Sequence, residues 1–359
     1  MKETDLSATP PPPGSPPSRP GEPAAAQKAP AAPGGGNEPS SPFLTGSVAE
    51  QLLHLPLDGN VDLAKTYQEC LQLAQAAKLP PALQAEFMEA ASEVIRRLLR
   101  YGGERANCTL SALSRSARIE WGALRGRLSS DSAPIYIGPL PNRAIPAPAE
   151  REATTSIAGW RWFPREGLSR IVLVSQPHPR EKEAGDMSLV VRRENKLRLV
   201  VADGLGHGPA AREAARRAIE ALRRDVHLDV GEAVYAAHTH VAGTRGATLG
   251  VADIDLQART VRSTTVGNVR VVLFYGVGRL WSPCGSDAVL GHGRGSGGQI
   301  EIRVEQHPLP ENAIVCLFSD GLASQLRLPW QRVDLDDLAV QLFQTFVVPN
   351  DDATLLLAS

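Results

Sequence analysis

Residues 201–215 read VADGLGHGPAAREAA, which combines the end of a strand, a glycine-rich turn and the start of a helix. Apolar residues lead into Asp203, although Asp is a poor strand former. The glycines at 204, 206 and 208 allow a sharp turn that brings a backbone carbonyl close to an ion. Residues 203–208 do not fit the GxGxxG pattern of a dinucleotide site, which disfavours that alternative.

The same pattern of an acid beside an apolar strand recurs along the chain. Asp186 opens one expected strand, Asp320 ends another, and Asp351 precedes the last strand. A single Asp-Gly pair is more often a plain turn. Convergent carboxylates repel one another unless a cation lies between them. Oxygen ligands of this kind favour Mg²⁺ or Mn²⁺ over zinc, so the pattern predicts a divalent-cation site.

The rest of the C-terminal half contains mainly expected strands, together with a few helices. The expected helices are 209–224, which has Pro at its first turn, and 335–346. Many strands with few, clustered helices indicate an α+β sandwich rather than alternating βαβ units. The expected strands are 171–175, 187–192, 197–202, 247–254, 260–265, 271–275, 313–318 and 353–358.

These motifs, taken together, resemble those of the PPM-type metal-dependent phosphatases. The stretch 201–215 is similar to the signature of their bacterial branch, the sporulation stage II protein E and RsbX type. The other matching motifs follow in family order. They are Gly185-Asp186, Gly246-Ala247-Thr248, Val266-Gly267-Asn268, Phe318-Ser319-Asp320-Gly321 and Asp351-Asp352-Ala353-Thr354.

The resemblance implies a β-sandwich flanked by α-helices, with two divalent cations, Mn²⁺ or Mg²⁺, at one end. Asp203 would bridge both ions, and the Gly204 carbonyl, Asp320 and Asp351 would be further ligands. Asp186 would bind directly or through water. A water held between the ions would attack phosphorus in line, so neither a Ser nor a Cys nucleophile is required.

Other residues near these motifs have two open interpretations. His207 could act as an acid towards the leaving oxygen, or it could cap the turn. Arg180 and Lys182 could steer phosphate, or they could simply face solvent. Asn268 is interpreted as a structural turn residue, and Asp352 as a residue behind the metal ligands.

Composition divides the chain into four regions. Residues 1–44 are rich in Pro, Ala and Gly and are expected to be a disordered tail. Residues 45–130 are expected to be a small, mainly helical region, with helices near 61–78 and 83–100 and short strands near 108–113 and 117–124. Residues 131–155 form a Pro-rich linker, and residues 156–359 form the phosphatase domain.

The helical region has a faint resemblance to anti-sigma-factor serine kinases of the GHKL type. It rests on residues 93–103, EVIRRLLRYGG, where Arg97 stands in the place of a metal-binding Asn. A positively charged side chain at that place argues against nucleotide hydrolysis. The helical region would then be a degenerate relative of these kinases. The alternative is a small helical interaction domain.

Charge and cysteine content limit the partners. A net charge of −1 gives no reason to expect nucleic acid or an anionic membrane, and no apolar run is long enough to span a bilayer. Four scattered cysteines without a CxxC pair indicate reduced thiols in a cytoplasmic protein.

Two functions follow from the resemblance. The first is metal-dependent hydrolysis of phosphoserine or phosphothreonine on a signalling partner, for which the RsbX type suggests a phosphorylated STAS-domain regulator. The second is a catalytically silent phosphatase fold that binds a phosphoprotein as a regulator.

Overall fold

The computed structural model describes residues 51–57, 61–101, 106–113, 115–125, 155–163, 165, 167–193, 195–224, 227–276, 279–292, 299–328 and 334–359. All the described residues belong to one compact unit. The predicted tail and nearly all of the predicted linker lie outside the described residues.

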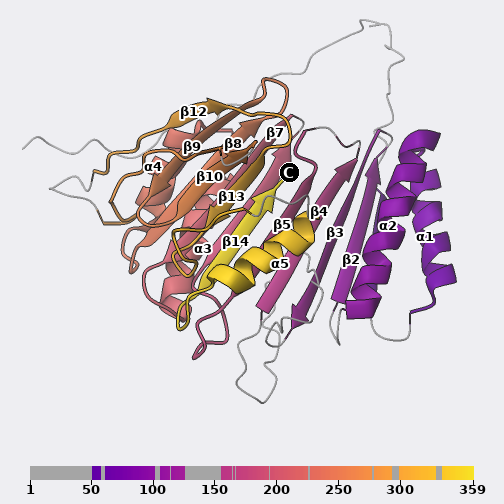
Figure 1. The fold of residues 1–359 in the computed structure, drawn as a ribbon, viewed down its shortest axis with the longest axis horizontal. Helices are drawn as coiled ribbons and strands as arrows, with labels where there is room; N and C mark the ends of the chain where they lie inside the picture. The colour runs from indigo at the N-terminus through magenta and orange to yellow at the C-terminus, as the bar shows by residue number, and fades with distance from the viewer. Residues whose placement is uncertain are drawn as a thin grey trace, which may run out of the picture. The chain divides into compact units, whose positions relative to one another are not determined.

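One antiparallel sheet of nine strands runs through the described part of the chain in the order β1-β2-β3-β4-β5-β14-β13-β10-β11 (Figure 1). Its strands are β1 Gln51–Leu57, β2 Ala106–Leu113, β3 Ser116–Arg125, β4 Thr155–Phe163, β5 Arg170–Gln176, β10 Arg270–Tyr275, β11 Arg279–Trp281, β13 Ile314–Phe318 and β14 Ala353–Ala358.

A second antiparallel sheet of five strands packs against the first, in the order β12-β9-β8-β7-β6. Its strands are β6 Met187–Arg193, β7 Lys196–Gly204, β8 Ala247–Asp255, β9 Thr260–Val266 and β12 Glu305–Pro308.

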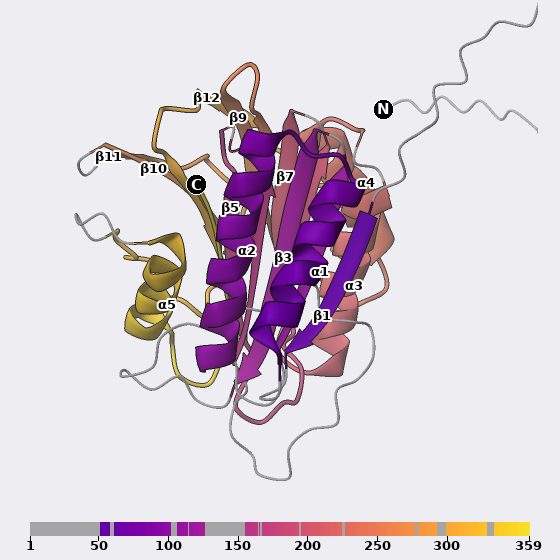
Figure 2. The ribbon, with the colours of Figure 1, turned by 90° about the vertical axis from the view of Figure 1, so that its right-hand side faces the viewer.

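Helices cover both outer faces of this sandwich. Helices α3 and α4 pack on the five-stranded sheet, while α1, α2 and α5 pack on the nine-stranded sheet. Figure 2 shows α5 on one side and α3 and α4 on the other, with α1 and α2 towards the viewer. The helices are α1 Leu63–Ala76, α2 Pro81–Tyr101, α3 Pro209–Arg224, α4 Val230–Val241 and α5 Leu335–Phe346.

Strand β7 has an almost continuously apolar sequence because it is buried on both faces. Leu199 and Val201 belong to the core between the sheets, whereas Val200 and Ala202 belong to the core under α3 and α4. Because successive side chains point to opposite faces, a strand buried on both sides needs apolar residues at every position. This strand ends at the glycine-rich turn, so the turn is held by a buried strand on one side and by α3 on the other.

The predicted α+β sandwich flanked by helices is confirmed. The region predicted to be mainly helical contains α1 and α2, but it also supplies β1, β2 and β3. Strand β3 pairs with β4, for example Trp121 with Gly159, so this region and the expected phosphatase region share one sheet. The predicted boundaries between these regions, and the faint GHKL likeness, stay predictions. In the described part of the chain, no helix is both long and apolar enough to cross a membrane.

Candidate metal and phosphate site

Asp203 is the second-to-last residue of β7, next to the glycine-rich turn, and is 9% exposed. It pairs with Thr248 on β8, whose Oγ1 lies 3.4 Å from Asp203 Oδ2. The Thr248 hydroxyl is 2.6 Å from Asn268 Oδ1, so it bridges the two side chains. The carboxylate is thereby fixed at the end of the sheet.

The turn after Asp203 can be built only with glycine at its first position. A Cβ at Gly204 would lie 1.8 Å from the carbonyl oxygen of Ala211. Gly206 and Gly208 have φ of 81° and 78°, a region that favours glycine. The chain therefore folds back tightly onto the first turn of α3, and the Gly204 carbonyl lies beside Asp203 in sequence.

Asp186 is buried where the chain enters β6. Its Oδ2 accepts a hydrogen bond of 2.6 Å from Ser319 Oγ, which in turn accepts one of 2.9 Å from the Thr354 N–H. Three segments that are far apart in sequence are thus joined by one network. The other oxygen, Asp186 Oδ1, is buried and has no hydrogen-bond partner.

Asp320 follows β13, and its Oδ2 accepts a hydrogen bond of 2.5 Å from Asn268 Nδ2. Asn268 was interpreted as a turn residue alone, but it also orients this carboxylate. Gly321 is required next to it, because a Cβ there would lie 1.9 Å from the Asp352 carbonyl oxygen. The turns that carry Asp320 and Asp352 are therefore in direct contact.

Asp351 and Asp352 lead into β14. Asp351 is partly buried, and Asp352 is 2% exposed. Asp352 Oδ1 accepts a hydrogen bond of 2.7 Å from the His178 N–H. A Cβ at Gly185 would lie 2.7 Å from Asp352 Oδ2. Asp352 therefore holds the loop that carries Asp186.

The pKa values show that these acids converge. Burial, followed by the charges of Asp186 and Asp320, raises the pKa of Asp203 to about 10. Burial, opposed in part by the hydrogen bond from Ser319, raises the pKa of Asp186 to about 7. Burial and the charge of Asp320 raise the pKa of Asp351 as well. Such a site holds protons until a cation replaces them.

The converging acids do not form a ready coordination shell. Among the described residues, no three His, Cys, Asp or Glu side chains are grouped so that they could hold one metal ion. Asp203 and Asp320 are instead within hydrogen-bonding reach of each other.

The side chain of His207 contacts the loop before Asp186. It is half exposed, and its Nδ1 lies 2.8 Å from Glu181 Oε1. Its ring stacks on that of His178, with centroids 4.1 Å apart and an angle of 10° between the planes. These contacts join the turn to the loop before Asp186, which supports the turn-fixing role over the acid role.

Sequence reasoning gave no role to Thr248, Ser319 or Arg245. Ser319 is fully buried beside Asp320, and a buried hydroxyl at a strand end is a signal for a hydrogen-bonded site. Thr248 has the same signal at 3% exposure. Arg245 precedes the Gly246-Ala247-Thr248 motif and gives no such signal, because an arginine in a loop usually faces solvent.

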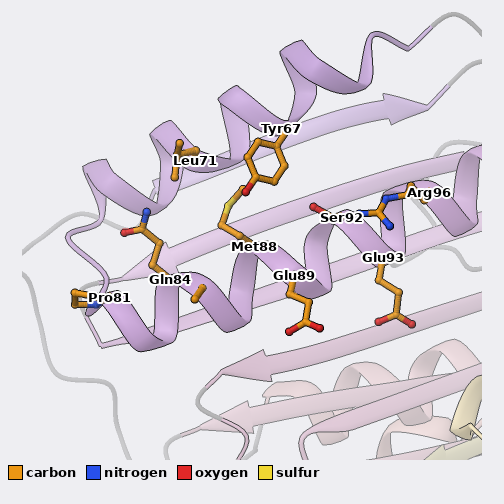
Figure 3. A pocket seen from close by; sticks show the side chains of 10 residues that line it. Tyr67, Leu71, Pro81, Gln84, Met88, Glu89, Ser92, Glu93 and Arg96 are labelled. Carbon is orange, nitrogen blue, oxygen red and sulfur yellow. The ribbon is translucent and has the colours of Figure 1, made fainter.

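A separate hollow of about 810 Å³ lies between α1 and α2 (Figure 3). Figure 3 shows Tyr67 of α1 pointing towards Met88 of α2 across it. None of the converging acids lines this hollow, so it is not part of the candidate site. Its lining residues are Tyr67, Leu71, Pro81, Gln84, Ala85, Met88, Glu89, Ser92, Glu93 and Arg96.

Solved structures of several phosphatases are similar to the chain. A structure from work on the bacterial stressosome is 23% identical over 53% of this chain and 98% of that chain, with a TM-score of 0.48. RsbX in complex with magnesium is 20% identical over 53% and 94%, with a TM-score of 0.46. The serine/threonine phosphatase PstP/Ppp of Mycobacterium tuberculosis is 18% identical over 53% and 97%, with a TM-score of 0.42.

The family comparison is more specific. No curated protein matches the chain. The profile of the family described as stage II sporulation protein E matches residues 193–359. The matched segment begins after Asp186 and includes Asp203, Asp320 and Asp351. The predicted family is therefore confirmed: over residues 193–359 the chain carries a PPM-type serine/threonine phosphatase domain of the stage II sporulation protein E family.

Proposed function

We propose that the chain is a Mn²⁺- or Mg²⁺-dependent protein phosphatase that hydrolyses phosphoserine or phosphothreonine. One observation supports it most: acids from separate segments of a domain of this family converge, and burial together with the charges of Asp186 and Asp320 raises the pKa of Asp203. A fold gains nothing from such repulsion by itself. A cation-binding function gives it a reason.

The chemistry of these residues suits two divalent cations, although among the described residues no three such side chains are already grouped around one ion. Asp203, Asp320, Asp351 and the Gly204 carbonyl would hold them, with Asp186 binding directly or through water. Every donor is an oxygen, as Mg²⁺ and Mn²⁺ prefer, and the unpartnered Asp186 Oδ1 is a free donor in a buried place. When bound, the cations would supply Lewis-acid chemistry, acidifying water and neutralising phosphoryl oxygens.

The chain's own residues prepare the site by orientation. Asn268 fixes one oxygen of Asp320, and Ser319 fixes one oxygen of Asp186. Cys316 in β13 is no candidate nucleophile, because its thiol is fully buried and burial raises its pKa. This supports direct attack by water on phosphorus without a covalent intermediate.

The proposed substrate is a phosphorylated signalling protein in the cytoplasm. The sequence motifs of the RsbX type suggest a STAS-domain regulator of a partner-switching pathway. This part of the proposal rests on the motifs at residues 201–215 and 351–354, not on any contact in the structure.

A phosphatase assay tests the proposal. Purified full-length chain with Mn²⁺ should hydrolyse an aryl phosphate and a phosphorylated STAS-domain protein, and a chelator should abolish both activities. Readdition of Mn²⁺ after chelation should restore them, which controls for denaturation by the chelator. Absence of turnover on both substrates with Mn²⁺ and with Mg²⁺ would contradict the proposal.

One observation favours a second candidate, a catalytically silent regulator that binds a phosphoprotein. Within the described residues, no three acids are already grouped around a point that could hold a metal. Calorimetric titration with Mn²⁺ distinguishes the two candidates. Saturable binding of two ions supports the enzyme, whereas failure to bind them supports the silent regulator.

A further inference from the structure

The loop between α4 and β8 brings an arginine to the glycine-rich turn. Arg245 is exposed, and its Nη1 lies 3.2 Å from the position that a Cβ of Gly206 would occupy. Apart from the two chain neighbours of Gly206, no other described residue lies within 4 Å of that position. The guanidinium therefore borders the open side of the turn that follows Asp203.

The backbone on both sides of Arg245 is held in place. Thr244 Oγ1 donates a hydrogen bond of 2.7 Å to the Val241 carbonyl and accepts one of 3.1 Å from the Gly246 N–H. The Gly246 carbonyl accepts a hydrogen bond of 3.0 Å from the Leu205 N–H, inside the turn itself. The loop is thus tied directly to the turn, so the arginine starts from a fixed point.

Arg245 differs from the arginine that follows the same turn in α3. Arg212 forms an ion pair with Glu183 at 2.9 Å. In the part of the chain that the structure describes, no carboxylate forms an ion pair with Arg245. A positioned guanidinium without a carboxylate is available to an anionic ligand.

The two ends of the turn carry opposite charges. At Gly208, a Cβ would lie 2.7 Å from Glu181 Oε1, so a carboxylate covers that end. At Gly206, the neighbouring group is the Arg245 guanidinium. A dianionic phosphoryl group is repelled at the first end and attracted at the second. The approach of an anion to the acids is therefore favoured from the side of Arg245.

We propose that Arg245 binds the phosphoryl group of the phosphomonoester substrate, and the phosphate product, beside the carboxylate site. This role rests on the proposed function, because it assumes that a phosphoryl group enters there. The planar guanidinium can donate two parallel hydrogen bonds to phosphoryl oxygens, which fixes the orientation of the group as well as its charge.

Inorganic phosphate is the probe for a direct test. Its dissociation constant would be measured by calorimetry on the Mn²⁺-loaded full-length chain and on the variants Arg245→Gln and Arg245→Ala. We expect phosphate binding to weaken by about tenfold to a hundredfold in both variants, since a charged hydrogen-bonding partner is lost. The KM for phosphoprotein should rise by a similar factor, with a smaller change in kcat. Arg279→Ala, at an exposed arginine on β11, is the matched control and should leave both values unchanged.

Two results separate this inference from the proposed function. Phosphate affinity equal to that of the wild type in Arg245→Gln would overturn the inference; this variant keeps most of the side chain, so its fold is retained even if Arg245→Ala melts early. Absence of turnover in the wild type, together with weaker phosphate binding in Arg245→Gln, would contradict the proposed function and still support the phosphate site.

Discussion

Two regions of this molecule gather charged side chains, most of them buried or half-buried, and they do so in opposite ways. In the carboxylate site, Asp186, Asp203, Asp320 and Asp351 converge without a cationic side chain among them. In the ion cluster under α2 and α5, which consists of Arg161, Arg170, Glu93, Asp334 and Asp336, each acid has an arginine. Arg161 contacts Glu93 at 2.8 Å and Asp336 at 3.5 Å, and Arg170 contacts Asp334 at 2.8 Å and Asp336 at 3.1 Å.

This difference suggests different roles for the two regions: the ion cluster stabilises the fold, whereas the carboxylate site is proposed to bind a ligand. In the ion cluster every acid contacts at least one arginine, and these contacts tie α2 and α5 to β4 and β5. In the carboxylate site, the charge of Asp186 instead adds to burial in raising the pKa of Asp203. Buried charges are normally paired or bound to metals. The acids of the carboxylate site have no such partner, so they are the ones expected to bind a ligand.

The largest effect is expected from Asp203→Ala. Removing the proposed bridging ligand should lower turnover at saturating Mn²⁺ by about a thousandfold or more, because metal activation and orientation are each worth several kcal/mol. The metal-free variant should melt close to the wild type, since the raised pKa keeps Asp203 uncharged at pH 7 and its loss leaves no buried charge unpaired. Asp255→Ala, at the opposite end of β8, is the control and should keep its turnover. Near-normal turnover of Asp203→Ala with a normal melt would contradict the site.

The ion cluster should give the opposite result. Arg161→Met removes the guanidinium that contacts the buried Asp336, so unfolding by urea should show a loss of about 3 kcal/mol. Turnover at temperatures well below the melting point should persist. Arg165→Ala breaks an exposed ion pair with Glu86 on the same helix, α2, and should cost about 1 kcal/mol or less. Equal costs in the two variants would show that the cluster does not stabilise the fold.

The pH dependence of stability should also distinguish the two regions. The pKa of Asp186 rises from 3.8 to about 7 in the folded chain, mainly through burial. Between these values the folded state binds the proton and the unfolded state does not, so the stabilisation is complete below about pH 4 and is lost as pH rises through 7. Asp186 alone should therefore contribute a loss of stability on the order of 2 kcal/mol to the metal-free protein between pH 5 and pH 8, and Asp203, whose pKa is raised further, adds to the loss in the same direction. Denaturant titrations at the two pH values measure this loss.

Asp186→Asn provides the control for this pH effect. The amide cannot ionise, so the variant should show a smaller loss of stability than the wild type between pH 5 and pH 8. Identical pH profiles for the two proteins would mean that Asp186 does not titrate in the folded state as described.

The smallest effect is expected from His207→Ala. Because His207 contacts Glu181 and His178 rather than the acids, its loss should reduce turnover by less than about tenfold. A general acid would contribute about a hundredfold or more. Steady-state rates with substrates of different leaving-group pKa measure this directly. A large loss that disappears with a good leaving group would restore the acid role.

Much of the C-terminal half could be predicted from sequence because its signals are local. Helices α3 and α5 and strand β14 have the predicted bounds, since a Pro at the first turn, an alanine stripe and a short apolar run mark them. Strand β4 was missed because part of its environment is distant in sequence. A Cβ at Gly159 would lie 2.3 Å from the Trp121 ring, a constraint that appears only once β3 is its neighbour.

Strand β1 and helix α4 were missed for other physical reasons. Strand β1 includes Pro56, which argues against a central strand but is tolerated at the edge of a sheet. Helix α4 is rich in β-branched and His residues, which are modest helix formers. Its capping box, formed by Asp229 and Glu232, was the signal that could have revealed it.

The candidate site also has some features that could be predicted from the sequence and others that could not. That acids at strand ends should converge could be predicted from their positions in the chain. The hydrogen bond from Ser319 to Asp186 spans 133 residues, and Arg245 meets Gly206 only because the loop before β8 bonds to the turn. Such contacts depend on which strands become neighbours, so no local pattern contains them.

Proton release on metal binding tests the central claim most directly. At pH 7 the raised pKa keeps a proton on Asp203, and a cation can bind only when that proton leaves. Calorimetric titration of Mn²⁺ into the metal-free chain, repeated in buffers of different ionisation enthalpy, measures the number of protons released. We predict saturable binding of two ions with release of roughly one proton per chain, and loss of that release in Asp203→Asn. Binding heats that do not depend on the buffer, or no saturable uptake of Mn²⁺, would contradict the account.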